Sequence, residues 1–427
     1  MRILLVSIYD VARSGGLSSH VEEVASAFSA AGHTVRVLTP YTARPAWRRR
    51  AVMDLPRLAL RVVDRDAAYR YFLASARRRL AAAIDAALAR DGADVIHAHD
   101  PVALLASRDA LARRAAPPAA AAVGETPRAR RAAIPCVLTV HGDIGNMAAS
   151  DGAVRPGGRG RQTAERLEAL AYASADALIT ADERLRRHCI ALAPRCAPLA
   201  FPNFVDVDRF RPARDGDEPE LLRARRSTGL GAAERFVLVP RRLVKKTGVV
   251  FAVRAMAHES LARPPHDAVV LAIAGDGPER AEIAREAEQL ALGGPGGRVR
   301  ILGDVPRAVL ASLYRAADAI AIPSISHAGV IEATSISALE AMATGKVVVA
   351  SRIGGLAELI DDGRTGLLVP EGDAPALAGA LRRVLDEPES SAAIGRSARE
   401  YVERERSTTA CARRLLEFYA RAASGAP

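Results

Sequence analysis

Short apolar runs with strand character alternate with helical or loop segments along the chain, and no other feature constrains the fold as strongly. This alternation is typical of parallel sheets whose strands are joined by crossover helices. The first half contains the runs Arg2–Ser7, Thr34–Thr39, Asp94–Ala98, Cys136–Val140 and Ala177–Thr180. The second half contains Phe236–Val239, Ala268–Ala274, Val299–Leu302, Ala319–Ile322, Val347–Ala350 and Gly366–Val369. We therefore predict an α/β fold with two Rossmann-like, doubly wound parallel-sheet domains.

The boundary between the two domains is expected near residues 202–220, PNFVDVDRFRPARDGDEPE, which are rich in Pro, Asp and Arg and lack periodicity. We predict domains at 1–203 and 204–395, followed by a C-terminal helical segment at 396–427. Residues 107–133 contain Pro117-Pro118 and a run of alanines. That composition predicts an extended or mobile loop insertion.

Composition excludes several classes of protein. The 427 residues are 49% hydrophobic and 26% charged, which suits sizeable buried cores, and no apolar run approaches the length of a membrane span. The N-terminal MRILLVSIYD is too short for a signal-peptide core, so we expect a cytoplasmic protein. The four cysteines are scattered without a C-x-x-C motif, which argues against a zinc site or a disulfide framework. The D-x-D triplets at 64–66 and 206–208 follow no convincing strand, and we assign no metal.

The net charge of +11 is concentrated in residues 41–80, where eleven Arg and three Asp give 11 − 3 = +8. Apolar and aromatic residues are interleaved with these arginines, a pattern that suits an anionic membrane surface or an acidic acceptor. An equally weighted interpretation is a solvated helix pair, because the whole chain has fifty-seven Arg and only three Lys. Nucleic acid is a weaker alternative, and we do not expect it as a partner.

Polar residues follow several of the predicted strands, where ligands collect in parallel sheets. Gly15-Gly16 follows the first strand and precedes a helix, a turn that lets backbone approach a phosphate. His97 and His99 end the third strand, and His141 ends the fourth. A single strand-end His is more often structural than catalytic, but the clustering of polar strand ends narrows that difference.

In the second half, PRRLVKKTG at 240–248 follows a strand and contains two of the three lysines. A retained ammonium in an Arg-rich chain suggests a point charge for a diphosphate. Gly275-Asp276-Gly277 follows the next strand, but Arg280 stands where a dinucleotide fingerprint has its third glycine. A hydride-transfer enzyme is therefore disfavoured.

The segment PSISHAGVIEATSISALEAMATG at 323–345 places Glu332 and Glu340 eight positions apart around a predicted helix start near Ser335. The free N–H groups of a helix start suit a phosphate, and carboxylates on either side can accept hydrogen bonds from hydroxyls. A sugar–diphosphate–ribose fits that description. The plain alternative is an ordinary helix with a surface glutamate.

Together these motifs resemble the family 4, or group 1, glycosyltransferases of the two-domain GT-B fold. The resemblance covers nearly the whole chain. It is carried by GGLSSHVEEVASAFSAAGHTVRVLT, VIHAH, VLTVHGD, PNFVDVDRF, PRRLVKKTG, AGDGPE, ILGDV and EATSISALEAMATGKVVVASRIGGLAELIDDGRTGLLV. Glu332 and Glu340 form the family's E-x7-E pattern. Two departures are Thr334-Ser335 in place of Phe-Gly and Thr247 before Gly248, so the functional arginine is either Arg241 or Arg242.

The resemblance implies two domains facing each other across a cleft and sugar transfer from a nucleotide sugar with retention of configuration. It implies no cofactor beyond that co-substrate, a UDP- or GDP-sugar, and no metal. The implied catalytic residues are His141, Arg242, Lys246 and Glu332. The implied donor-binding residues are Gly16, Arg242, Lys246, Gly275, Val305, Ile336, Ser337 and Glu340.

The acceptor expected from the resemblance is a glycan or a lipid-linked molecule, with peripheral contact to the inner face of a membrane through residues 41–80. The C-terminal helix is expected to pack back on the first domain. Two other functions stay open at this point: a nucleotide-sugar epimerase or hydrolase on the same fold, and a catalytically silent nucleotide-sugar-binding protein.

Overall fold

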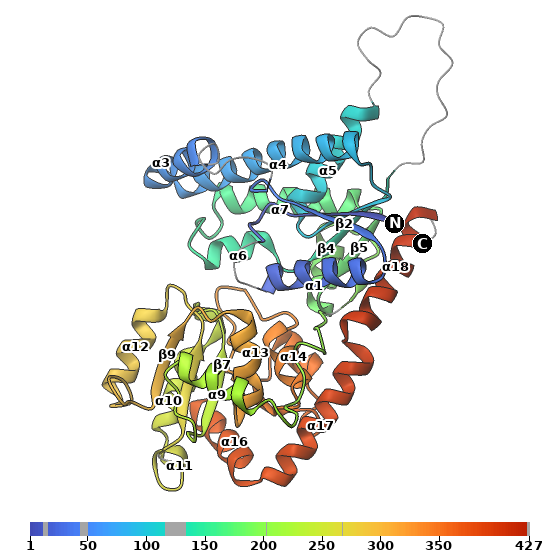
Figure 1. Ribbon diagram of the computed structural model, residues 1–427. Coiled ribbons are helices and arrows are strands. Elements are labelled where there is room, and N and C mark those ends of the chain that lie inside the picture. Colours follow the sequence, from blue (N-terminus) through green and yellow to red (C-terminus); the bar gives the residue numbers. More distant parts are fainter. Residues whose placement is uncertain (12–15, 43–49, 116–133, 202, 267, 425–427) are drawn as a thin grey trace, which may run out of the picture. The chain divides into compact units, whose positions relative to one another are not determined.

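The computed structural model describes residues 1–427 except 12–15, 43–49, 116–133, 202, 267 and 425–427. The chain forms two compact units (Figure 1). The N-terminal unit comprises residues 1–202 together with the chain from Ala412 onward, and the C-terminal unit is Asn203–Cys411. Residues 396–411, which the sequence analysis grouped with the last segment, thus cluster with the C-terminal unit. Among the described residues, no helix combines the length and the apolar character needed to cross a membrane.

The N-terminal unit is built on a six-stranded parallel sheet with strand order β2-β1-β3-β4-β5-β6. Its strands are β1 (Arg2–Val6), β2 (Thr34–Leu38), β3 (Val95–Ala98), β4 (Cys136–Val140), β5 (Ala177–Thr180) and β6 (Leu199–Ala200). Its helices are α1 (Gly16–Ala30), the π-helical turn η1 (Arg50–Asp54), α3 (Leu55–Val63), α4 (Arg65–Arg90), α5 (Pro101–Ala115), α6 (Ile144–Ser150), α7 (Arg159–Ser174) and α8 (Glu183–Leu192).

The C-terminal unit has a second six-stranded parallel sheet with strand order β12-β11-β10-β7-β8-β9, the order of a Rossmann fold. Its strands are β7 (Phe236–Pro240), β8 (Val270–Ala274), β9 (Val299–Gly303), β10 (Ala319–Ile322), β11 (Val348–Ser351) and β12 (Leu367–Val369). Its helical segments are α9 (Glu218–Ser227), the 3₁₀ turn η2 (Lys245–Thr247), α10 (Val249–Ala257), α11 (Glu259–Ala262), α12 (Arg280–Gln289), α13 (Arg307–Ala316), α14 (Ile336–Ala343), α15 (Gly354–Leu359), α16 (Ala374–Asp386) and α17 (Pro388–Glu405).

The predicted fold class is confirmed, and each of the eleven predicted strands is present with its ends displaced by two residues at most. The reason is visible in β7, where alternate side chains pack into different cores. Val237 and Val239 belong to one buried cluster, and Phe236 and Leu238 belong to another. A strand that is buried on both faces is a continuous apolar run, which is the pattern that sequence reveals most clearly.

One prediction about local structure is wrong. Residues 107–115 are not part of a loop, because α5 continues to Ala115. Leu104, Leu105 and Ala110 are buried on α5. The buried face of the helix therefore continues into the region predicted to be a loop. The remainder of the predicted insertion, residues 116–133, lies outside the described residues.

The last helix, α18 (Thr408–Ser424), contributes a buried tyrosine to the N-terminal unit. The Tyr419 hydroxyl lies 2.6 Å from Nδ1 of His97, and the Tyr419 ring packs against Phe28 of α1 with ring centroids 5.6 Å apart. Figure 1 shows this part of α18 beside α1. These contacts join this part of α18 to β3 and α1 of the N-terminal unit.

Candidate functional site

The C-terminal unit brings polar side chains together at the point where its strand order reverses. β7 and β10 are neighbours in the sheet, but their crossover connections run in opposite directions. The connections that follow two such strands turn to opposite sides of the sheet. The crevice between them, at the carboxyl ends of the strands, is the usual ligand site of a doubly wound sheet. Arg241 follows β7 directly, and Ser324 follows β10 after Pro323.

Arg241 is the centre of this group. Its guanidinium donates to Ser335 Oγ at 2.9 Å, to Ser324 Oγ at 3.1 Å and to Glu332 Oε2 at 2.9 Å. Arg241 and Glu332 are both buried, with 8% and 9% of their surface exposed. Burial alone would raise the pKa of Glu332. The attraction of Arg241 and Lys246 and the hydrogen bond from Arg241 outweigh that effect, and the pKa of Glu332 lies below its usual value.

Lys246 lies in the turn η2, and Gly248 follows the turn directly. Gly248 has a φ of +60°, and a Cβ there would lie 2.0 Å from the Pro323 carbonyl oxygen. Glycine therefore lets this turn pack directly on the backbone that follows β10. The Ile325 N–H donates to the Lys246 carbonyl at 2.8 Å, which joins the two loops further. The neighbouring Lys245 is exposed, and its ammonium lies 4.0 Å from Glu282.

Helix α14 begins beside Arg241. Ser335 caps it, with its Oγ accepting from the Ala338 N–H, so the predicted helix start is confirmed. Ile336 and Ser337 are its first two residues, and the first N–H groups of a helix have no partner within the helix. The Ser337 hydroxyl donates to the Pro240 carbonyl at 2.9 Å, which fixes the helix start against the end of β7.

Glu340 is on the second turn of α14 and is also buried, with 5% of its surface exposed. Its Oε2 accepts from the Tyr314 hydroxyl at 2.9 Å, and its Oε1 lies 3.4 Å from Arg307. Burial raises the pKa of Glu340 to about 7, although Arg307 and the Tyr314 hydroxyl favour the charged form. This carboxyl group therefore titrates near neutral pH.

The two remaining predicted residues of this unit lie on adjacent loops. Gly275 follows β8, and a Cβ there would lie 2.0 Å from the Arg241 carbonyl oxygen, so only glycine lets this loop approach the Arg241 backbone. Val305 follows β9 and packs at the edge of the core that contains Leu339 and Ala341 of α14. The Gly275 loop thus contacts the Arg241 backbone, and the Val305 loop packs on the same core as α14.

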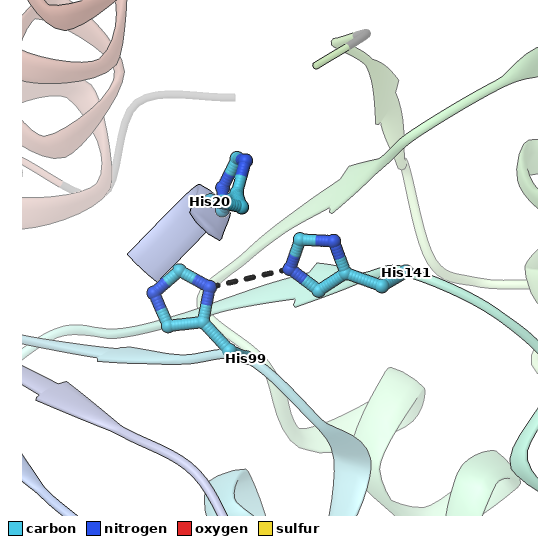
Figure 2. A group of neighbouring side chains, drawn as sticks. All are labelled: His20, His99 and His141. Carbon is cyan, nitrogen blue, oxygen red and sulfur yellow. Dashed lines mark hydrogen bonds between the residues drawn. The ribbon is translucent and has the colours of Figure 1, made fainter. Parts of the chain in front are cut away.

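The N-terminal unit contains a separate group of polar residues at its own strand ends. His99 Nδ1 lies 3.3 Å from His141 Nε2, and the His20 ring lies across both in edge-to-face contact, as Figure 2 shows. Burial lowers the pKa of His141 to about 4 and the pKa of His99 well below its usual value. The two rings are therefore neutral near pH 7, and His141, which is partly exposed, can exchange hydrogen bonds with a hydroxyl group.

The loop that carries His99 is fixed by its neighbour Asp100. The Asp100 carboxylate accepts from the Ser7 hydroxyl and the Ile8 N–H at the end of β1, at 2.9 and 2.8 Å. It also accepts from the Ala103 N–H at the start of α5, at 2.7 Å. β1 and β3 flank the point where this sheet reverses its strand order. Asp100 therefore joins the loops at the carboxyl ends of these two strands, where ligands usually bind in such sheets. Gly16 is the first residue of α1, which follows β1.

Sequence reasoning left the choice between Arg241 and Arg242 open, and in the structure Arg241 is the residue in contact with Glu332. The Arg242 side chain is exposed. Three further residues were missed: Ser324, Tyr314 and Arg307. Ser324 could have been found as a polar residue close behind a strand, whereas Tyr314 and Arg307 lie on a helix with no local signal.

Three nitrogens, one each from His20, His99 and His141, lie within 4.8 Å of one another, a spacing that a metal ion could bridge. Two of these three residues, however, form the His99–His141 hydrogen bond. That hydrogen bond accounts for the His99–His141 contact, whereas His99 Nε2 is buried without a hydrogen-bond partner among the described residues.

Two family models match adjacent parts of the chain. Residues 14–209 match Glycosyltransferase Family 4, and residues 222–401 match Glycosyl transferases group 1. A D-inositol 3-phosphate glycosyltransferase from Corynebacterium jeikeium is 35% identical over 208 residues, which are 48% of this chain and 47% of that protein. A GDP-mannose-dependent alpha-(1-6)-phosphatidylinositol monomannoside mannosyltransferase from Mycolicibacterium smegmatis is 35% identical over 218 residues, which are 50% of this chain and 54% of that protein. The matched region thus spans about half of each of these relatives.

Solved structures resemble the whole chain. Sucrose-phosphate synthase from Thermosynechococcus elongatus superposes with a TM-score of 0.70 at 23% identity, covering 98% of both chains. Anabaena HepE in complex with UDP-glucose superposes with a TM-score of 0.68 at 18% identity, covering 98% of this chain and 99% of HepE. These likenesses establish the fold. Taken with the two family models, they place this chain among the group 1, family 4 glycosyltransferases of the GT-B fold.

Proposed function

We propose that this protein is a retaining glycosyltransferase that moves a sugar from a UDP- or GDP-sugar to a lipid-linked or anionic glycan acceptor. The observation that carries the proposal is the buried Arg241–Glu332 pair beside Lys246 and the start of α14, with Glu340 one helical turn further on. Cations, helix N–H groups and two carboxylates within one unit match the parts of a nucleotide sugar: diphosphate, sugar and ribose.

The charge arrangement suits departure of a nucleoside diphosphate. Negative charge grows on the diphosphate as the sugar–phosphate bond breaks, and preorganised positive groups stabilise that charge most. We assign this role to Lys246 and the N–H groups of Ile336 and Ser337, and Arg242 is the further candidate from the sequence. The macrodipole of α14 adds positive potential at the same end.

Glu332 and Glu340 would bind hydroxyl groups. Arg241 holds Glu332 in its charged form, so Glu332 can accept hydrogen bonds from the sugar near its anomeric carbon. Glu340 would accept from the ribose, Gly275 and Val305 would line the donor site through their backbones, and Gly16 and His141 would serve from the N-terminal unit. In this proposal the leaving phosphate takes the proton of the acceptor hydroxyl, and Glu332 forms no covalent bond to the sugar.

The proposed acceptor class is supported by α3, which has no buried residue. Its Leu55, Leu58 and Val62 are 60%, 61% and 84% exposed and lie three and four positions apart, on one face of the helix. Arg57 and Arg61 lie on the same short helix. A basic helix with an exposed apolar face suits the surface of an anionic membrane, where a lipid-linked acceptor resides. The relatives that act on inositol phosphate and phosphatidylinositol mannoside support the same class.

A donor screen tests the proposed activity. A nucleotide sugar that binds the native state raises the melting temperature by mass action, so UDP- and GDP-sugars are compared by thermal shift. The stabilising donor is then incubated with and without inositol-phosphate and phospholipid acceptors, and the anomeric configuration of the product is determined by NMR. Transfer with retention supports the proposal. Sugar release or rearrangement without acceptor identifies a hydrolase or epimerase, and binding without turnover identifies a silent binder; either result would refute it.

A further inference from the structure

A second group of ionisable side chains lies in the N-terminal unit, outside the histidine group of Figure 2. Asp143 is the N-cap of α6, Glu168 is on α7 and His188 is on α8. His188 Nε2 lies 3.7 Å from Asp143 Oδ2 and 4.0 Å from Glu168 Oε2, and one ligand atom from each residue lies within 4.8 Å of the others. Three segments that are distant in sequence therefore direct one imidazole and two carboxylates to the same point.

The protein uses only part of the hydrogen-bonding capacity of these groups. Glu168 Oε1 accepts from the Ile144 N–H at 2.8 Å and from the Tyr172 hydroxyl at 3.2 Å. The other oxygen, Oε2, is buried and has no hydrogen-bond partner among the described residues, and the same holds for His188 Nε2. The Glu168 side chain is fully buried, and a buried carboxylate oxygen without a partner is costly. The two unpartnered atoms face each other across a gap too long for a hydrogen bond.

The spacing and chemistry of the three atoms suit a divalent cation. Imidazole nitrogen and carboxylate oxygen bind Zn²⁺ at about 2.0–2.2 Å, and tetrahedral geometry then separates pairs of ligands by roughly 3.3–3.6 Å. The two separations from His188 Nε2, 3.7 and 4.0 Å, require only a small movement of the side chains to meet that range. The two carboxyl groups, when ionised, also supply the charge that balances a divalent ion. The His188 side chain is 24% exposed, which leaves a route for the ion to enter.

We infer that Asp143, Glu168 and His188 form a binding site for one divalent transition-metal ion of the Zn²⁺ type. The ion would join the turn after β4 to α7 and α8. Since Asp143 is two residues beyond His141, the ion would also hold the loop that carries His141. This inference differs from the sequence-based expectation of no metal, and it stands independently of the proposed transferase activity.

The histidine group is the competing location for a metal ion in this unit. In that group His99 and His141 already satisfy each other through a hydrogen bond. His99 Nε2 is nevertheless buried without a partner among the described residues, as Glu168 Oε2 and His188 Nε2 are in the Asp143–Glu168–His188 group. In the latter group Asp143 Oδ2 accepts from the Asn146 side-chain amide at 2.6 Å. What favours this group is its two carboxyl groups, which can balance the charge of a divalent ion, whereas three imidazoles cannot. The test therefore compares variants of both groups.

The test measures metal binding without any nucleotide sugar, so its outcome is separate from that of the donor screen. The full-length protein is stripped with EDTA and dialysed against Zn²⁺, and bound metal is measured by mass spectrometry across a concentration series. We expect one ion per chain and a higher melting temperature in the zinc-bound form. His188→Ala and Glu168→Gln should each weaken binding by at least about tenfold, since loss of a mere second-shell partner often costs that much.

Controls separate this site from general metal binding. Glu165→Gln changes a partly exposed carboxylate on the same helix, paired with Arg161, and should leave zinc binding unchanged. Glu168→Gln keeps an oxygen for Ile144 and Tyr172, and circular dichroism checks its folding. If it does not fold, His188→Ala decides, because the ring nitrogen proposed as a ligand has no hydrogen bond to lose. Absence of bound zinc, which would mean that water fills the gap, or binding that survives His188→Ala but is lost in His141→Ala, would overturn the inference.

Discussion

Arg241 and Glu332 form a buried ion pair, with Nη2 and Oε2 2.9 Å apart, although 91 positions separate them in the sequence. Neither charge is well hydrated, and each therefore depends on the other and on the hydroxyls of Ser324 and Ser335. The pair joins the loop after β7 to the loop before α14. The residues of the candidate site thus also contribute to the stability of the C-terminal unit.

Arg241→Ala should destabilise the C-terminal unit by about 3–5 kcal/mol, because it leaves the Glu332 charge buried without its partner. Urea unfolding measures the change. Arg242→Ala is the matched control: its side chain is exposed, and we expect a change within about 0.5 kcal/mol. Equal effects of the two substitutions on unfolding would contradict the structural assignment of Arg241.

Lys246→Ala should lower the turnover number about a hundredfold, the scale of losing one preorganised electrostatic group at a departing phosphate. Steady-state kinetics with the donor found in the screen provide the measurement. Lys245→Ala removes the adjacent ammonium, which is exposed and lies near Glu282, and should change turnover little. A folded Lys246→Ala protein with unchanged kinetics would exclude Lys246 from the site.

Glu332→Gln should lower sugar transfer by at least about a hundredfold, because a neutral amide stabilises developing positive charge on the sugar poorly. Binding of the free nucleoside diphosphate, measured by calorimetry, should remain close to that of the original protein. The two measurements together separate a role at the sugar from a role at the phosphate. Full transfer activity would refute the role proposed for Glu332.

Glu340→Gln should change how stability depends on pH. The pKa of Glu340 is raised from 4.5 to about 7 in the folded protein, so between these values the native state binds more protons than the unfolded state. Ionisation of Glu340 therefore lowers the free energy of unfolding progressively as pH rises from about 4.5 to about 7. The total loss is about 3 kcal/mol, and it stays constant at higher pH.

Glu340→Gln removes this contribution. Relative to the original protein, the variant should gain stability as pH rises through that interval. Urea unfolding of both proteins at several pH values measures the difference. Contributions from titrating groups that both proteins share cancel in this difference; Asp100 is one, since burial raises its pKa to about 6. A difference that does not vary with pH would show that Glu340 titrates normally.

Replacing Leu58 and Val62 of α3 by Asp should abolish binding to vesicles of anionic phospholipid at low salt, because it places charge on the apolar face. Co-sedimentation measures the bound fraction, with neutral vesicles as the reference. Leu170→Asp is the control, since Leu170 is an exposed leucine of α7 with 57% of its surface accessible. Failure of the original protein to bind anionic vesicles would remove the support for a membrane-resident acceptor.

Local patterns in the sequence were sufficient for the strands and for the start of α14. A strand buried on both faces is an apolar run whatever its neighbours are, and Ser335 caps α14 through a contact three residues away. The same locality explains the error at residues 107–115. Pro117-Pro118 and a run of alanines indicated a loop over the whole of 107–133, whereas α5 is held in place by the sheet and helices on which its apolar residues pack.

The sequence by itself determined the alternation of strands and helices, the strand-end residues of both sheets and the Glu332–Glu340 pair, because each of these depends on a few consecutive residues. The tertiary structure decided that Arg241 rather than Arg242 contacts Glu332, since adjacent residues after a strand point to opposite sides and only packing fixes which side is buried. It also decided that Asp143, Glu168 and His188 lie close together. Their proximity arises from the packing of three helices, so no recognisable spacing in the sequence predicts it.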